Sequence, residues 1–315
     1  MANVDLSIII PARNNKAKNA SIIKMISEET QDYDVEFIIL DMNSTDGGVL
    51  EALNMMRTGN LKGSVIQCGN GTVCSALNTG IYRANGKYIT FVYPTRLYKN
   101  YINEYMVKAE EKDAEFVFAA PATNGEGHKN VIPEGIMGTD LVVSLIRSSV
   151  YIDFTAVLFR RDFLVSNSIL FYEECTVGYA EAFIYNALLA NPVLAYVDRE
   201  IKRDYVNSLS GGSRKGTSNN CFERLEAMIK VSENAKRLHK NDAVLNDAFE
   251  YQKLPAVVIN CINKLLDEGF TKTSIRKLLK NKGYDEYLSI SGSTNDELKK
   301  RVVEWKFIPW IYKNQ

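Results

Sequence analysis

Short apolar runs alternate with helically spaced apolar positions along the first two hundred residues. The apolar runs, which predict strands, lie at 6–10, 35–40, 64–68, 88–92, 115–119, 155–160 and 193–197. Helical spacing occurs between them at 19–29, 50–56, 73–84, 100–112 and 181–190. Strands that alternate with helices in this way form βαβ units around a mostly parallel sheet. The pattern therefore predicts an α/β fold with helices flanking the sheet.

Two stretches depart from this alternation. Residues 121–150 are rich in glycine and asparagine, which predicts a long loop. Beyond residue 219 the spacing is helical only, at 222–238, 244–266, 271–280 and 295–305. A Gly/Ser-rich segment at 211–217 precedes these helices. We therefore predict an α/β domain over 1–214 and an all-helical C-terminal region over 215–315.

Composition narrows the classes of function. The 315 residues carry 38 basic and 38 acidic side chains. Zero net charge argues against a nucleic-acid partner, because binding to polyanions depends on an excess of Lys and Arg. The five cysteines form no C-x-x-C pair, and no apolar stretch reaches the roughly 18 residues of a membrane span. We expect a protein of the cytoplasm.

The carboxyl ends of the strands are where a sheet of this kind binds ligands. These ends are at 11–15, 41–47, 69–72 and 93–96. None carries the glycine pattern of a dinucleotide-binding turn or of a P-loop, which argues against both. His128 and His239 lie outside all four ends, which argues against a Ser-His-Asp triad.

The strand ends and the elements around them resemble the family 2 glycosyltransferases of the GT-A fold. The segment LSIIIPARN at 6–14 is similar to the family's S-x-I-I-P-x-Y-N opening, and FIILDMNSTDG at 37–47 to its I-I-x-V-D-D-G-S-T-D-G segment. ALNTGI at 76–81 and ANGKYITF at 84–91 resemble a third block, and DYVNSLS at 204–210 the tail motif. The resemblance covers roughly residues 5–212 and is specific as an ordered set.

The resemblance implies a site for a nucleoside-diphosphate sugar, with a UDP-sugar as the expected donor. Asp41 would accept a hydrogen bond from the base or ribose; alternatively, it only caps a turn. Asn78 would help to bind the donor, or only support a neighbouring loop. The other nucleotide-sugar-binding positions that the resemblance implies are Pro11, Arg13, Asn14, Ser44, Tyr93 and Thr95. The family's Ser-Thr-Asp-Gly segment makes Asp46 a turn residue.

Two chemical parts of the family are missing. In the family, an Asp-x-Asp motif that holds Mg²⁺ or Mn²⁺ follows the fourth strand, but this chain has Tyr93-Pro94-Thr95-Arg96 there. Without carboxylates we expect no metal cofactor. Arg96, with Lys99 or Arg13, is our candidate for stabilising the leaving diphosphate, since a guanidinium matches phosphate oxygens. The alternative is that Arg96 is a solvated loop cation.

The second missing part is the general base. The family places Glu-Asp at the start of a helix, and the aspartate removes the acceptor's proton; here the residues are Glu181 and Ala182. Glu181 is our candidate base. The alternative is that it only interacts favourably with the helix dipole.

The C-terminal 46 residues hold ten basic and five acidic side chains and both tryptophans, Trp305 and Trp310. Basic residues beside aromatic ones suit peripheral contact with the inner face of a membrane. The alternative is that these aromatics pack on the core or on a second subunit, which would make the protein a homo-oligomer.

Two functions follow. The first is an inverting, metal-independent glycosyltransferase that acts on a glycan or lipid-linked acceptor, with Arg96 and Glu181 as its catalytic residues. The second is a catalytically inactive homologue that binds nucleotide-sugar or glycan, or serves as a partner subunit.

Overall fold

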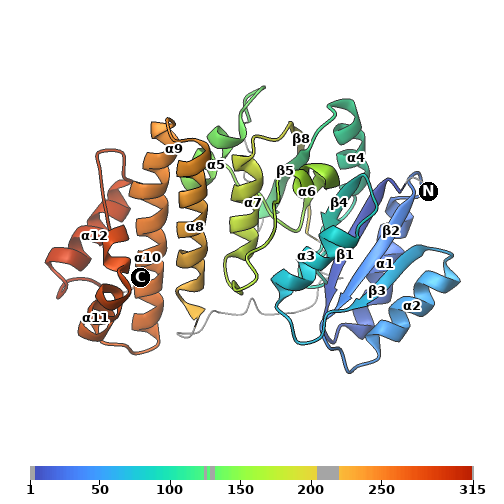
Figure 1. Cartoon of the computed structure of the whole chain (residues 1–315), viewed down its shortest axis with the longest axis horizontal. Helices are drawn as coiled ribbons and strands as arrows, with labels where there is room; N and C mark the ends of the chain where they lie inside the picture. Colours follow the sequence, from blue (N-terminus) through green and yellow to red (C-terminus); the bar gives the residue numbers. More distant parts are fainter. Residues whose placement is uncertain (1–3, 124–125, 128–131, 204–219, 314–315) are drawn as a thin grey trace.

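An eight-stranded sheet lies at the centre of the α/β part, in the order β3-β2-β1-β4-β7-β5-β6, with β8 also pairing to β5 (Figure 1). The computed structural model describes residues 4–123, 126–127, 132–203 and 220–313. Its strands are β1 (Leu6–Ala12), β2 (Val35–Asp41), β3 (Lys62–Gln67), β4 (Tyr88–Phe91), β5 (Phe116–Thr123), β6 (Glu126–Gly127), β7 (Val157–Arg160) and β8 (Leu194–Ile201).

Parallel pairing joins β1 to β2 and β4, β2 to β3, and β5 to β8, whereas β7 pairs antiparallel to β4 and β5. The predicted mostly parallel sheet flanked by helices is therefore confirmed.

The helices number α1 to α12 along the chain, with two irregular turns among them. They are α1 (Lys16–Glu29), α2 (Gly48–Thr58), α3 (Val73–Arg83), α4 (Ile102–Glu111), α5 (Gly138–Ile146), α6 (Arg161–Ser166), α7 (Tyr179–Leu189), α8 (Glu223–Leu238), α9 (Ala243–Ala248), the π-helix η2 (Phe249–Lys253), α10 (Leu254–Asp267), α11 (Lys272–Lys282), the 3₁₀-helix η3 (Tyr284–Tyr287) and α12 (Asp296–Phe307). No helix in the described ranges has the length and hydropathy needed to cross a bilayer.

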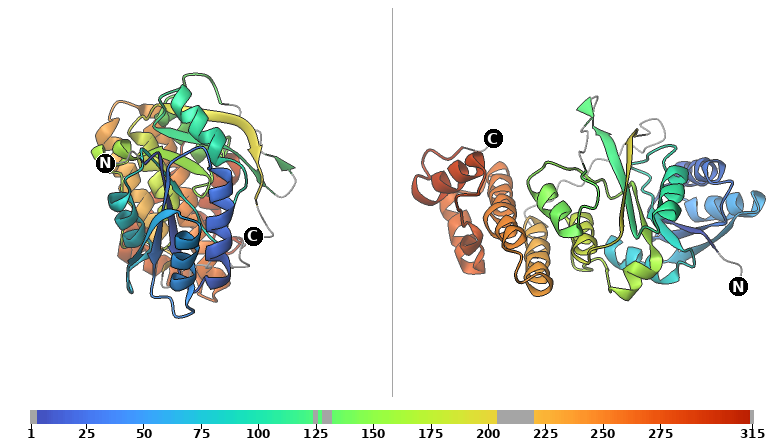
Figure 2. Two further views of the ribbon diagram at one scale, coloured as in Figure 1. Left: turned by 90° about the vertical axis from the view of Figure 1, so that its right-hand side faces the viewer. Right: turned by 90° about the horizontal axis from the view of Figure 1, so that it is seen from above.

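Alternate residues of β1 face two different hydrophobic cores, as the two-residue period of a strand requires. Ile8 and Ile10 pack with α1, α2 and α4, whereas Ile9 packs on the other face with α3 and α7. The second core continues through α8 and α10 to Trp305 and Tyr312, each only 2% exposed. Figure 1 and the right view of Figure 2 show this helical row extending away from one side of the sheet.

The prediction of a loop over 121–150 is wrong for the second half of that range, where the helix α5 lies. Leu141 and Val142 are buried in the second core, and the helix packs tightly on α7. Gly138 permits this approach, since a Cβ at that position would lie 2.0 Å from the carbonyl oxygen of Leu188. The predicted domain boundary after residue 214 lies outside the described residues.

The helix predicted over 244–266 is interrupted by η2. Pro255 has no N–H to donate to the carbonyl of Tyr251, and its ring crowds that carbonyl. The backbone widens instead: the N–H of Leu254 bonds to the carbonyl of Phe249, five residues back. Thr294 Oγ1 donates to the freed carbonyl of Tyr251 at 2.9 Å.

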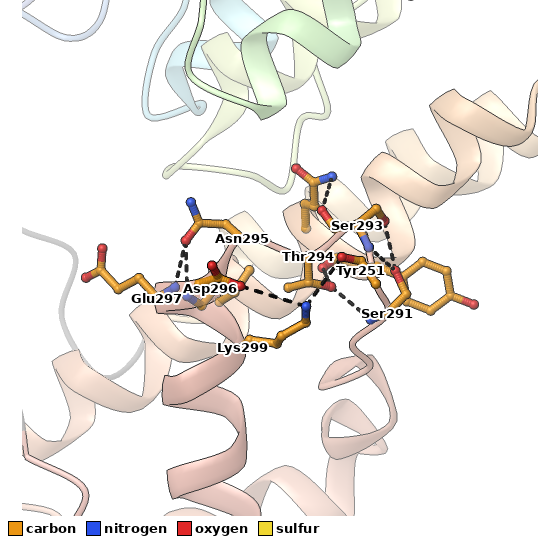
Figure 3. Close-up of polar contacts among 11 residues, drawn as sticks. Tyr251, Ser291, Ser293, Thr294, Asn295, Asp296, Glu297 and Lys299 are labelled. Atoms are coloured by element: carbon orange, nitrogen blue, oxygen red, sulfur yellow. Dashed lines mark hydrogen bonds and ion pairs between the residues drawn. The ribbon is translucent and has the colours of Figure 1, made fainter.

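The hydrogen bond from Thr294 to Tyr251 and the N-cap of α12 hold the loop before α12 in place (Figure 3). The hydroxyl of Thr294 also accepts from the N–H of Ser291, at 2.9 Å. Asn295 Oδ1 accepts from the N–H of Glu297, at 2.9 Å, and so caps α12. The last helix is thereby anchored to η2.

We predict that Thr294→Val lowers the free energy of unfolding by about 2 kcal/mol, because it leaves a buried carbonyl without a donor. Ser289→Ala is the control, since its hydroxyl donates to the carbonyl of Glu286 near the surface. Urea unfolding of both variants measures the difference. Equal losses for the two would contradict the proposed anchor.

Candidate functional site

The loops after β1 and β2 are tied to each other at the carboxyl edge of the sheet. The N–H of Asn14 donates to Ser44 Oγ at 3.1 Å, and Asn14 Oδ1 accepts from the N–H of Thr45 at 2.9 Å. Asp41, only 5% exposed, accepts from the N–H of Ser44 at 3.1 Å. Three of the predicted nucleotide-binding residues are therefore neighbours in space.

Pro11 and Arg13 frame the same edge. Pro11 is buried and lies opposite Leu40 in the β1–β2 pairing, and Arg13 is exposed just beyond the end of β1. Asn14 has a positive φ of 54°, a conformation that asparagine tolerates better than most residues. The chain thus turns sharply where the strand ends, leaving polar groups at the sheet edge.

Asp46 holds this turn, as the sequence predicts. Its carboxylate accepts from the N–H groups of Lys16, at 2.8 Å, and Gly48, at 2.9 Å. These bonds lower the pKa of Asp46. One carboxylate therefore fixes the starts of both α1 and α2 behind the loops.

Asn78 supports a loop, which is the second of its two predicted roles. Its side-chain oxygen accepts from the N–H of Phe171 at 2.8 Å, and its amide donates to the carbonyl of Phe171 at 3.0 Å and to Glu173 at 3.3 Å. With both ends of the amide engaged and only 5% exposure, it is poorly placed to contact a donor.

The segment after β4 turns one predicted site residue inward and leaves another exposed. Tyr93 packs against Phe154, and its hydroxyl is 3.4 Å from that of Tyr179. Burial raises the pKa of Tyr93. Thr95 is exposed, and its carbonyl accepts from Arg203 at 3.0 Å.

Arg96 forms an ion pair that the sequence does not predict. Its Nε lies 2.6 Å from Oδ2 of Asp153, and its Nη2 donates to the hydroxyl of Tyr151 at 3.0 Å. The Arg96 side chain is 40% exposed, as the alternative of a loop cation would have it, but its guanidinium also compensates a carboxylate that is 5% exposed.

Asp153 pairs with Arg96, in the segment where the resemblance implies a metal site, and its oxygens are already engaged. Besides Arg96, it accepts from the hydroxyl of Tyr98 at 2.6 Å and from the N–H and hydroxyl of Thr155, both at 3.0 Å. Among the described residues, no three His, Cys, Asp or Glu side chains gather where they could hold a metal ion. A divalent cation prefers several available carboxylate oxygens, so this donor set does not fit one.

Glu181 lies in the first turn of α7 and is held between two cations of the C-terminal helices. Arg224 of α8 donates to both its oxygens, at 2.9 and 3.2 Å, and Lys253 of η2 pairs with one of them. Burial opposes ionisation of Glu181, but the charges of Lys253 and Arg224 outweigh it and lower the pKa of Glu181 to about 2. Ala182 is buried in the core.

A pocket of about 640 Å³ brings these two ion-pair clusters together. Its charged lining consists of Arg96, Asp153, Glu181, Arg224 and Lys253. The sequence identified Arg96 and Glu181 but missed the other three. The sequence held one signal for Lys253: Pro255, two residues later, interrupts the helical pattern and so marks an irregular turn there.

Comparison with known sequences gives one family. Residues 7–92 match the model described as Glycosyl transferase family 2. No curated protein matches the chain.

Solved structures share the fold at low sequence identity. S. aureus TarS superposes with a TM-score of 0.56 and 16% identity, over 82% of this chain and 43% of that one. S. aureus TarS 1-349 in complex with UDP-GlcNAc gives a TM-score of 0.58 and 15% identity, over 96% and 81%.

A third structure is the mannosyltransferase PcManGT from Pyrobaculum calidifontis, in complex with GDP-Man and Mn²⁺. It gives a TM-score of 0.53 and 12% identity, over 98% and 86% of the two chains. Of the first of the two TarS structures, which is the longer chain, the match covers less than half.

The resemblance predicted from the motifs is confirmed. Residues 7–92 have the sequence pattern of glycosyl transferase family 2, and the chain has the GT-A fold of the solved glycosyltransferases.

Proposed function

We propose that the chain is a glycosyltransferase that moves a sugar from a nucleoside-diphosphate sugar to a glycan or lipid-linked acceptor. The expected nucleotide of the donor is UDP. The observation that carries this proposal is the pair of tied loops around Asp41, which lie within the segment that matches the family model. The similar structures bind UDP-GlcNAc and GDP-Man, which supports a nucleotide-sugar as the ligand.

In this proposal the loops after β1 and β2 bind the nucleoside. Asp41 accepts a hydrogen bond from the base or ribose, and Pro11, Arg13, Asn14 and Ser44 flank it. Thr95 and Arg96 lie beyond β4, on the side of the diphosphate. The acceptor hydroxyl attacks the anomeric carbon in line and gives its proton to Glu181, the candidate base. The bond to the diphosphate breaks with its electron pair leaving on phosphate oxygen, so the configuration inverts.

Metal independence is part of the proposal. The mannosyltransferase complex contains Mn²⁺, whereas the donor set after β4 in this chain does not fit a divalent cation. A guanidinium has five N–H groups; Arg96 directs Nε toward Asp153, donates from Nη2 to Tyr151 and also bonds to Tyr98. Its other N–H groups are the ones we assign to the leaving diphosphate.

A second function is favoured by one observation at α7. A carboxylate whose pKa is about 2 is a weak base, and Glu181 is bound by Arg224 and Lys253. Ala182 supplies no second carboxylate. If Glu181 does not remove the acceptor proton, the chain is a catalytically inactive homologue that binds nucleotide-sugar or glycan, or acts as a partner subunit.

The C-terminal helices suggest where the protein works. Trp305 and Tyr312 are buried, but Phe307 and Trp310 are 69% and 74% exposed, near the exposed Lys306 and Lys313. We propose that this end contacts either the inner face of a membrane or a second copy of the chain, in the cytoplasm.

We predict that UDP-GlcNAc or another UDP-sugar binds the full chain equally well with and without EDTA, because no metal mediates the contact. Asp41→Asn is expected to weaken binding roughly tenfold, through loss of a charge-assisted hydrogen bond. Isothermal titration calorimetry measures both, with the exposed Asp32→Asn as the matched control. Strict dependence on Mn²⁺ would refute metal independence, and no binding of any nucleotide would favour the partner-subunit function.

We predict that Glu181→Gln lowers the free energy of unfolding at pH 7 by about 3 kcal/mol, since it leaves the buried Lys253 and the half-buried Arg224 without their carboxylate. Because the pKa of Glu181 falls from 4.5 to about 2 on folding, its stabilisation is complete above about pH 5 and is lost as the pH falls toward 2. The gap between wild type and variant should therefore narrow at low pH, as measured by urea unfolding.

The control for this experiment is Glu174→Gln. Glu174 pairs with Lys230 where both side chains are largely exposed, so its loss should cost less than about 1 kcal/mol. A gap for Glu181→Gln that matches this control, or that stays constant from pH 7 to pH 3, would show that the ion pairs do not hold Glu181.

A further inference from the structure

The pocket between α7 and the C-terminal helices has an excess of positive charge. Three cationic side chains, Arg96, Arg224 and Lys253, line it against two carboxylates, Asp153 and Glu181. Its volume of about 640 Å³ lies in the range of small-molecule sites.

Both carboxylates of the pocket are already engaged as acceptors. Asp153 forms an ion pair with Arg96 and accepts hydrogen bonds from Tyr98 and Thr155. Glu181 accepts twice from Arg224 and once from Lys253. Gln252 and Asn260 also line the pocket and can both donate and accept, so the neutral side chains suit either kind of ligand. The excess positive charge distinguishes the two, because it stabilises an anion and not a neutral sugar. The pocket therefore favours an anion.

Lys253 owes its position to the π-helix. It is the last residue of η2, the segment that Pro255 forces to widen, and its side chain is 10% exposed. Its Nζ lies 5.1 Å from the ring centre of Tyr185 and pairs with Glu181 across the pocket wall. Single π-helical turns of this kind occur frequently at functional sites. This irregularity is independent of the charge count and marks the same pocket.

We propose that this pocket binds an anionic group, a phosphate or a carboxylate, that belongs to the acceptor substrate. The inference deepens the proposed transferase function, because it assigns the acceptor a charge. Arg224 and Lys253 bind the anion, and Glu181, the candidate base, also orients these two cations. The nucleoside of the donor occupies the loops around Asp41, and its diphosphate is assigned to Arg96, which also lines the pocket.

Calorimetry on the full chain, with saturating UDP present, tests the proposal. The probes are inorganic phosphate, glycerol 3-phosphate and glucuronate, with glycerol and glucose as neutral counterparts. We expect inorganic phosphate and at least one charged probe to bind, and neither neutral compound to bind. Preference for glycerol 3-phosphate identifies a phosphorylated acceptor, and preference for glucuronate an acidic sugar.

Variants of one lysine locate the binding. Lys253→Gln should raise the dissociation constant for phosphate roughly tenfold, and Lys253→Arg, which keeps the charge, should stay close to wild type. Lys236→Gln is the matched control, because this lysine of α8 pairs with Glu250 at the surface. Thermal unfolding of each variant separates a loss of binding from a loss of fold.

Three results would overturn the proposal: neutral and charged probes that bind alike, phosphate binding that UDP abolishes, or phosphate binding that Lys253→Gln leaves unchanged in a folded protein. Failure of the donor function has a different signature. If the donor function fails, titration with UDP releases no heat of binding, while phosphate still binds and its binding still depends on Lys253.

Discussion

Two poorly solvated carboxylates, Asp153 and Glu181, each require a cation, and this requirement organises the site. An ionised carboxylate away from water is stable only when it is paired and hydrogen-bonded. Asp153 takes Arg96 from the segment after β4, and Glu181 takes Arg224 and Lys253 from the C-terminal helices. The same pairs remove the carboxylate oxygens that a divalent cation would need, and they fasten the helical region to α7.

This compensation connects the changed motifs to one another. Where the resemblance implies metal-binding acids, this chain has a segment whose Arg96 pairs with Asp153, and where it implies a catalytic aspartate, the chain has the buried Ala182. The glutamate that survives is bound by two cations. In the proposed function, cationic side chains take the place of a metal ion's charge, and three of them face two carboxylates in one pocket. The loops around Asp41, the proposed donor site, lie within the segment that matches the family model.

Local patterns were enough to predict the sheet, its flanking helices and the group of residues near Asp41. Strand periodicity and turn chemistry act over a few residues, and the carboxyl ends of parallel strands meet wherever such a sheet forms. The ion pairs were not predictable, because Arg96 and Asp153 are 57 positions apart and Glu181 and Lys253 are 72 apart, and one sequence does not reveal which distant charges meet.

Two helical elements were also missed. The helix α5 was missed because Gly and Asn around it masked its apolar spacing. The π-helix was missed because the effect of Pro255 depends on packing. The tail motif at 204–210 lies outside the described residues.

The central claim is that a nucleotide-sugar site persists at the ends of β1 and β2 without a metal ion. A crystal structure of the protein grown with UDP and manganese chloride, with anomalous diffraction recorded near the manganese edge, tests it most directly. The account predicts uridine beside Asp41, with the diphosphate directed toward Arg96, and no anomalous peak between them. A manganese ion coordinated at residues 93–96, or a site filled by the protein's own side chains, would contradict it.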